Sequence, residues 1–100
     1  MSELSFEWDP IKAEINKQKH GISFEEAETV FDDPLAVLFD DEVHSIYEPR
    51  EIIIGHSIYQ QLVFVCFTDR DSSIRIISAR RATPRAVSYT HLTLPTILRV

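Results

Sequence analysis

A stretch near the start of the chain combines apolar residues at helical spacing with residues that cap helices. Asp9-Pro10 favours a helix start, because Asp accepts hydrogen bonds from free N–H groups and Pro fits the first helical position. Gly21 is typical of a helix end. The pattern therefore predicts a first helix over about residues 10–20, with Ile11 and Ile15 on one face.

A second helix is predicted directly after the first. Ser23, followed three residues later by Glu26, forms a capping box at its start. Its apolar stripe consists of Phe24, Ala27, Val30 and Phe31. The run Asp32-Asp33-Pro34 ends it.

From residue 35 onward, β-branched and aromatic runs alternate with polar turns. The runs predict strands over residues 35–39, 51–58, 62–68 and 74–79, and residues 6–8 predict a short edge strand. The turn at Tyr59-Gln60-Gln61 lacks the Gly or Asn that a tight hairpin prefers. The order β-α-α-β-β-β-β indicates an α+β fold, with two N-terminal helices packed on a mainly antiparallel sheet of four to five strands.

Alternation along the predicted strands assigns side chains to faces. In the last strand, one face is expected to carry Arg75, Ile77 and Ala79, and the other Ile74, Ile76 and Ser78. Cys66 lies within an apolar strand, which favours a buried thiol over a nucleophile. It is the only cysteine, so the chain forms no internal disulfide.

Composition places the chain among globular proteins of one domain. It has 100 residues, of which 44% are apolar and 26% are charged, close to the globular average. The N-terminus carries acids where a secretory signal would carry positive charge, and no apolar run is long enough to span a bilayer. We therefore expect a soluble, cytoplasmic protein that does not bind a membrane.

The net charge of −6 conceals an asymmetry between the two halves of the chain. Residues 1–51 hold 14 acidic and 4 basic residues, whereas residues 52–100 hold 2 acidic and 6 basic residues. The acidic total argues against a non-specific nucleic-acid coat. A local basic site remains compatible with it, because salt screens the distant acids.

Arginine is the side chain that most clearly points to chemistry. The four histidines lack the short spacing of metal ligands, and the two glycines form no phosphate-binding loop. The chain carries Arg50, Arg70, Arg75, Arg80, Arg81 and Arg85 in its later part. Such a cluster suits the phosphates of RNA or DNA, because a guanidinium binds phosphate through a planar fork of donors. The alternative is surface ion pairing with Glu48, Glu51, Asp69 and Asp71.

Two other residues have both a structural and a functional interpretation. His20 is a cation at the end of the first predicted helix, and an imidazole that titrates near neutrality could also move a proton. Trp8 fits a core or interface position, and its ring could instead stack on an RNA base.

Several short motifs occur in a fixed order between about residues 6 and 85. They are Phe6-Glu7-Trp8-Asp9-Pro10, Lys12, Asn16, Lys19-His20-Gly21, Phe24, Glu26-Ala27, Phe31-Asp32-Asp33-Pro34, Glu48-x-Arg50, Ile54-Gly55 and the run over residues 75–83. Together they resemble the BrnT-type toxins of type II toxin–antitoxin systems. The resemblance implies a RelE-like fold and a metal-independent endoribonuclease, without cofactor, that inhibits translation and growth. It also implies a small antitoxin with a ribbon-helix-helix-type DNA-binding domain, through which the complex reaches DNA.

A ribonuclease of this kind gives the basic residues specific roles. RNA carries its own nucleophile, the 2′-hydroxyl, so the protein must align the phosphate, stabilise its added charge and move protons. The residues expected to face the phosphate are Arg50, Arg70, Arg80 and Arg81. His20, with Lys19 beside it, is the expected proton-transfer residue. Arg75 ranks below these, because alternation alone leaves its strand face open.

The C-terminal segment departs from the pattern of the family. The family continues after Ala82-Thr83 into a charged helix, whereas residues 87–100 hold one charge, Arg99. The run Val87-Ser88-Tyr89-Thr90-His91-Leu92 resembles one translated frame of a common transposon sequencing adaptor, with an ordinary tail as the alternative. We therefore divide the chain into one toxin-like domain, residues 1–86, and a non-native tail, residues 87–100, that could impair activity.

A non-catalytic role is the alternative to a ribonuclease. A regulator that only binds nucleic acid, or a module whose basic face docks an acidic protein, would use the same arginines. The appearance of new RNA ends distinguishes cleavage from either kind of binding.

Overall fold

The computed structural model describes residues 4–41 and 48–82 of the chain. In chain order they form β1 (Phe6–Glu7), α1 (Pro10–His20), α2 (Phe24–Thr29), the 3-10 helix η1 (Val30–Asp32), β2 (Val37–Asp40), β3 (Glu51–His56), β4 (Leu62–Arg70) and β5 (Ser73–Arg81). The predicted α+β class and element order are confirmed. The predicted tail and the boundary at residues 86–87 lie outside the described residues.

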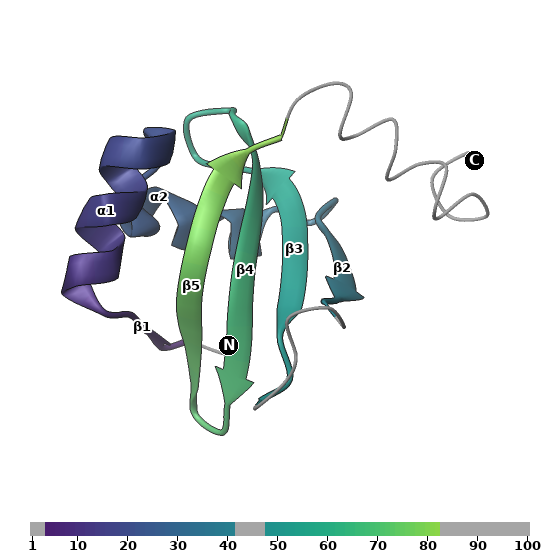
Figure 1. Ribbon diagram of the computed structural model, residues 1–100. Helices are drawn as coiled ribbons and strands as arrows, with labels where there is room; N and C mark the ends of the chain where they lie inside the picture. The colour runs from purple at the N-terminus through teal and green to yellow at the C-terminus, as the bar shows by residue number, and fades with distance from the viewer. Residues whose placement is uncertain (1–3, 42–47, 83–100) are drawn as a thin grey trace.

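All five strands join one mixed sheet in the order β1-β5-β4-β3-β2. Strands β2 to β5 are antiparallel neighbours, while β1 lies parallel to β5, with Phe6 opposite Ile74. Figure 1 shows α2 and η1 behind the sheet and α1 along the β5 edge. The opposite face of the sheet carries no helix in the part of the chain that the structure describes.

The hydrophobic core lies between the helices and one face of the sheet. Its fully buried members include Ile22, Phe24, Ala27, Val30, Val63 and Val65. The apolar stripe predicted for the second helix therefore faces the core, with its first three positions buried and Phe31 partly buried against them. Trp8 packs edge-to-face against Phe24, with ring centroids 5.8 Å apart, which supports the structural interpretation of this residue.

The predicted caps form at the helix ends, but only the Ser23 half of the predicted capping box is present, because the Glu26 carboxylate bonds elsewhere. Asp9 Oδ1 accepts the N–H of Ile11 at 2.9 Å, and Ser23 Oγ accepts the N–H of Glu26 at 3.0 Å. Gly21 ends α1 with a φ of 73°, a left-handed conformation that glycine adopts without a Cβ clash. Local sequence signals are therefore sufficient to place both helices.

The Glu26 side chain fastens the turn between β3 and β4 to α2. Its Oε2 accepts hydrogen bonds from Ser57 Oγ at 2.7 Å and from Gln61 Nε2 at 2.9 Å. Within this turn Gln60 adopts a φ of 65°, so a glutamine takes the left-handed position for which the sequence offers no Gly or Asn. The bonds to Glu26 hold the turn in place despite that unfavourable conformation.

Helix α1 is attached to the sheet through a polar side chain. Ile11 and Ile15 are 71% and 57% exposed, so the face that their spacing defines points to solvent. Asn16 is buried instead, and its Nδ2 donates to the carbonyl oxygens of Ile22 at 3.0 Å and Ala79 at 2.8 Å. Its Oδ1 accepts the N–H of Ala79 at 3.1 Å. The amide therefore pairs with the edge of β5 beyond the end of the short strand β1.

A β-bulge interrupts the pairing of β4 with β5. Cys66 lies opposite Ser78, but its neighbour Phe67 lies opposite Ile76. Ile77 is therefore an extra residue in β5.

The bulge reverses the faces of β5 beyond Ile76, so strict alternation is a wrong prediction for the end of this strand. Ile74 and Ile76 are buried, as expected for one face. Beyond the extra residue, Ala79 is buried and Ser78 is exposed, the opposite of the predicted arrangement. Arg80 consequently points to the face of the sheet that carries no described helix.

Asp33 ties the segment after η1 to the end of β3. Its Oδ2 accepts the N–H of His56 at 2.7 Å, and its Oδ1 accepts the N–H of Leu35 at 2.9 Å. Gly55 makes this approach possible, because a Cβ there would lie 2.8 Å from Ala36 Cβ and 2.9 Å from Asp33 Oδ2. The two segments therefore meet at a spacing that only glycine allows.

We expect these bonds to make stability depend on pH. The backbone N–H of His56, and then that of Leu35, hold the pKa of Asp33 below its ordinary value. The unfolded chain therefore binds the proton more readily, so this contribution is present above about pH 4 and is lost as the pH falls through the folded pKa. The midpoint of urea unfolding should fall between about pH 5 and pH 3, and it should fall less in Asp33→Asn than in the native chain.

Asp40→Asn is the matched control, because it removes an exposed carboxylate of β2. It should retain the native difference between the two urea midpoints. An undiminished pH dependence in Asp33→Asn would contradict this role of the carboxylate.

Candidate functional site

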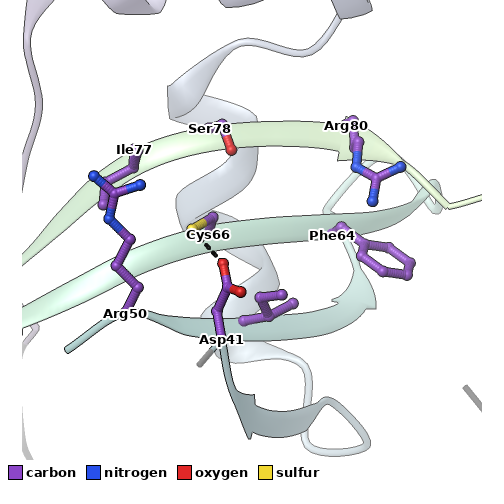
Figure 2. A pocket seen from close by; sticks show the side chains of 8 residues that line it. Asp41, Arg50, Phe64, Cys66, Ile77, Ser78 and Arg80 are labelled. Carbon is purple, nitrogen blue, oxygen red and sulfur yellow. Dashed lines mark hydrogen bonds between the residues drawn. The ribbon is translucent and has the colours of Figure 1, made fainter. Parts of the chain in front are cut away.

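A hollow of about 240 Å³ lies on the face of the sheet opposite α2. It is lined by Asp41, Arg50, Ile52, Phe64, Cys66, Ile77, Ser78 and Arg80, and we call it the arginine hollow. Figure 2 shows Arg50 and Arg80 at its two ends, with Asp41 and Ser78 on opposite sides of Cys66. The hollow therefore collects residues from segments that are distant in the sequence.

Arg80 reaches the hollow because the bulge turns it to this face. Its guanidinium carbon lies 4.9 Å from the centre of the Phe64 ring, a distance typical of a cation–π contact. The two residues are cross-strand partners in β4 and β5, so their side chains stand side by side. Within residues 4–41 and 48–82, no ion pair joins Arg80 to a carboxylate.

Arg50 and Asp41 meet where β2 ends and β3 begins. The N–H of Asp41 donates to the carbonyl oxygen of Arg50 at 2.9 Å, which brings the two side chains to one end of the hollow. Asp41 also accepts a hydrogen bond from the Cys66 thiol, with 3.8 Å between Sγ and Oδ2.

Cys66 lies in a strand as predicted, but it is half-buried and lines the hollow rather than the core. Burial raises the pKa of the Cys66 thiol, and the charge of Asp41 raises it further, while Arg50 lowers it in part. The thiol therefore stays protonated near neutral pH and acts as a donor to Asp41, not as a nucleophile.

A second hollow, of about 280 Å³, adjoins the first along the edge of β5. It is lined by Lys12, Ile15, Asn16, Lys19, His20, Ile77 and Ser78, and we call it the α1 hollow. Ile77 and Ser78 line both hollows. The bulge is therefore their common wall, and Lys19 and His20 lie next to the arginine hollow without lining it.

Arg81 lies outside both hollows, on the helix side of the sheet. It is paired with Val63, whose side chain is in the core, so the two side chains share that face. Its Nη2 would lie 3.9 Å from a Cβ placed on Gly21. Arg81 therefore lies beside Gly21, at the end of α1.

Arg70 lies at the other end of the sheet. Its Nη2 is 3.3 Å from Glu48 Oε1, and its Nη1 is 3.7 Å from Glu7 Oε2. Arg75 Nη1 is also 3.7 Å from Glu7 Oε2. Both arginines therefore form ion pairs, with Glu48 as a predicted partner and Glu7 as one that the sequence did not indicate, and the predicted cluster divides into separate groups.

Sequence analysis did not name Phe64, Ser78 or Asp41 as site candidates, although all three line the arginine hollow. Alternation along β4 could have indicated Phe64, since it lies between Val63 and Val65 and therefore points to the face opposite the core. Ser78 reaches the hollow through the bulge, for which the sequence carries no evident signal. Asp41 is one acid within a polar run, and only the meeting of two strand ends singles it out.

The described residues contain no group of three or more His, Cys, Asp or Glu side chains placed to hold a metal ion. No helix among those same residues is long and apolar enough to cross a membrane.

Comparisons with known proteins assign the chain to a family. A family model described as the ribonuclease toxin, BrnT, of type II toxin–antitoxin systems matches residues 8–86. The chain belongs to the BrnT toxin family. Its fold is similar to the crystal structure of the Brucella abortus ribonuclease toxin BrnT, with a TM-score of 0.64 and 25% sequence identity over 81% of this chain and 99% of that chain. A search of curated proteins found no match.

BrnT membership confirms the resemblance drawn from the sequence motifs. It identifies the chain as a toxin of a type II toxin–antitoxin pair, a class that implies an antitoxin partner. The two helices and the five-stranded mixed sheet match the BrnT fold.

Proposed function

We propose that this BrnT toxin is an endoribonuclease that cleaves RNA at the arginine hollow and thereby inhibits translation and growth. The observation that carries the proposal is the convergence of Arg50 and Arg80 on one face of the sheet, beside Lys19 and His20. The description of the family as ribonuclease toxins supports it.

In the proposed reaction the RNA supplies its own nucleophile. The 2′-hydroxyl oxygen bonds to the adjacent phosphorus and loses its proton, and the bond from phosphorus to the 5′ oxygen breaks. The products are a 2′,3′-cyclic phosphate and a 5′-hydroxyl end. Arg50 and Arg80 hold the phosphate and stabilise the negative charge that develops on its oxygens. No other co-reactant is needed.

Lys19 and His20 are placed for proton transfer across the bulge. They lie in the α1 hollow, which shares Ile77 and Ser78 with the arginine hollow. In this proposal His20 exchanges the proton with the 2′ or the 5′ oxygen, and Lys19 adds positive charge beside it. Arg81, next to the end of α1, supports Lys19 and His20 and does not bind the phosphate itself.

The partner in this proposal is a small antitoxin with a ribbon-helix-helix-type domain. It covers the toxin, and the complex reaches DNA through the antitoxin. The RelE-like architecture that the resemblance implies belongs to the same proposal. So does the division of the chain into residues 1–86 and a non-native tail, which sequencing the 3′ end of the source gene tests directly.

Mapping of RNA ends tests the proposed activity. The purified chain is incubated with an end-labelled RNA, and the new ends are identified chemically. We expect 2′,3′-cyclic phosphate and 5′-hydroxyl ends, and no cut at a position where a single 2′-deoxynucleotide replaces the nucleophile. RNA that stays intact while binding the chain in a salt-dependent manner would overturn the proposal in favour of a non-catalytic regulator.

A further inference from the structure

The arginine hollow contains more apolar surface than phosphate binding requires. Its apolar lining residues are Ile52, Phe64, Cys66 and Ile77, and each of them is half-buried. Phosphate oxygens are satisfied by charged donors and gain nothing from such an apolar lining. The flat ring of an unstacked base does gain from it, because bases stack on aromatic and apolar side chains.

The placement of Arg80 leaves it able to contact both a base and a phosphate. Its guanidinium carbon lies over the Phe64 ring, 4.9 Å from the ring centre. A guanidinium has five N–H donors, so a contact with one ring leaves donors for a phosphate. The pair of Arg80 and Phe64 thus forms one wall of the hollow, opposite Arg50 (Figure 2).

Asp41 is an unexpected side chain for a site that binds phosphate alone. Its carboxylate lies in the hollow between the two arginines, where it weakens the attraction for a phosphate. A carboxylate does suit the edge of a base that presents hydrogen-bond donors. The Cys66 thiol donates to Oδ2, and a carboxylate has about four acceptor positions, so one carboxylate can serve several donors at the same time.

We infer that the arginine hollow holds one unpaired RNA base between Arg50 and the Arg80–Phe64 pair, with Asp41 accepting hydrogen bonds from its donor edge. Guanine is the base that fits, because its N1–H and exocyclic amine present two donors side by side. The phosphates on either side of this base then meet the two arginines. This inference rests on the proposed function, since it names the base next to the cleaved bond.

Binding of free nucleotides tests the base site without any cleavage. The probes are GMP, IMP, which lacks the exocyclic amine, and AMP, which has an acceptor at N1. We expect the native chain to bind GMP about tenfold or more tightly than AMP, with IMP between them, measured by calorimetry. Equal affinities for the three nucleotides would overturn the inference.

Two variants assign the preference to the carboxylate. In Asp41→Asn the ratio of GMP to AMP affinity should fall to within about threefold, because one acceptor oxygen becomes a donor. Asp40→Asn changes the neighbouring acid of β2, which does not line the hollow, and should keep the native ratio. An unchanged ratio in Asp41→Asn, in a variant whose unfolding transition matches that of the native chain, would also overturn the inference.

Two outcomes distinguish the base site from the ribonuclease activity. RNA cleavage together with equal binding of the three nucleotides contradicts the base site and leaves the ribonuclease proposal standing. Preferential GMP binding without new RNA ends contradicts the ribonuclease and leaves the base site standing.

Discussion

Replacing Arg80 by alanine is expected to lower kcat/KM for RNA cleavage by about a hundredfold or more, the usual cost of removing one donor to a developing charge. Arg80 reaches the arginine hollow through the bulge and has no described carboxylate partner. Arg80→Lys keeps the charge but loses the planar fork of donors, so its kcat/KM should lie between those of the native chain and Arg80→Ala. Initial rates on a labelled RNA, together with growth arrest on expression, provide the measurement.

Arg70→Ala is the matched control for this loss. It removes the same type of side chain from the far end of the sheet, where Glu7 and Glu48 hold it. We expect native cleavage rates, with a loss of at most about 1 kcal/mol in the free energy of unfolding, because the ion pairs are exposed. Equal losses of activity in the two variants, or full activity in Arg80→Ala, would contradict the assignment of the site.

Replacing Asn16 by alanine is expected to lower the free energy of unfolding by about 2–4 kcal/mol. The variant loses three hydrogen bonds and leaves the buried N–H and carbonyl groups of Ala79 without their partner. Asn16→Asp should be no milder, because it keeps the acceptor for one N–H and places a carboxylate against two carbonyl oxygens. Urea denaturation of the native chain and the two variants measures the effect.

Gln18→Ala is the control on the same helix. Its Nε2 donates only to exposed Glu14 Oε2, at 3.1 Å, so the expected change is within about 0.5 kcal/mol. If Asn16→Ala is no less stable than Gln18→Ala, the amide does not anchor α1 to the sheet.

Local signals predict the helices of this fold well. Asp9, Ser23 and Gly21 each act on backbone groups within three residues or so, and each does in the structure what its type favours. The anchoring of α1 was not predictable in the same way. Spacing places Ile11 and Ile15 on one face of α1, but this face is exposed. The contact with the sheet edge is made by Asn16 instead, because an amide bonds to both the N–H and the carbonyl oxygen of Ala79.

The candidate site was predicted by residue type and only partly by position. Arg50 and Arg80 do line one hollow, and Lys19 and His20 lie beside it. Arg70 does not join them, because acids from distant segments of the chain, Glu7 and Glu48, surround it. Such pairings depend on the sheet order, with β1 beside β5, which alternation within a strand does not encode.

The extra residue in β5 also affects how the length of this strand can change during evolution. Without Ile77 the pairing of β4 with β5 would be regular, because the residues on either side of the bulge already have consecutive partners in β4. Arg80 would still lie opposite Phe64, and Ala79 would stay in the core. A single-codon deletion at this position therefore changes the wall that the two hollows share, but neither the core nor the face on which Arg80 lies. Descendants of this strand can differ by one residue in length and still present the arginine to the hollow.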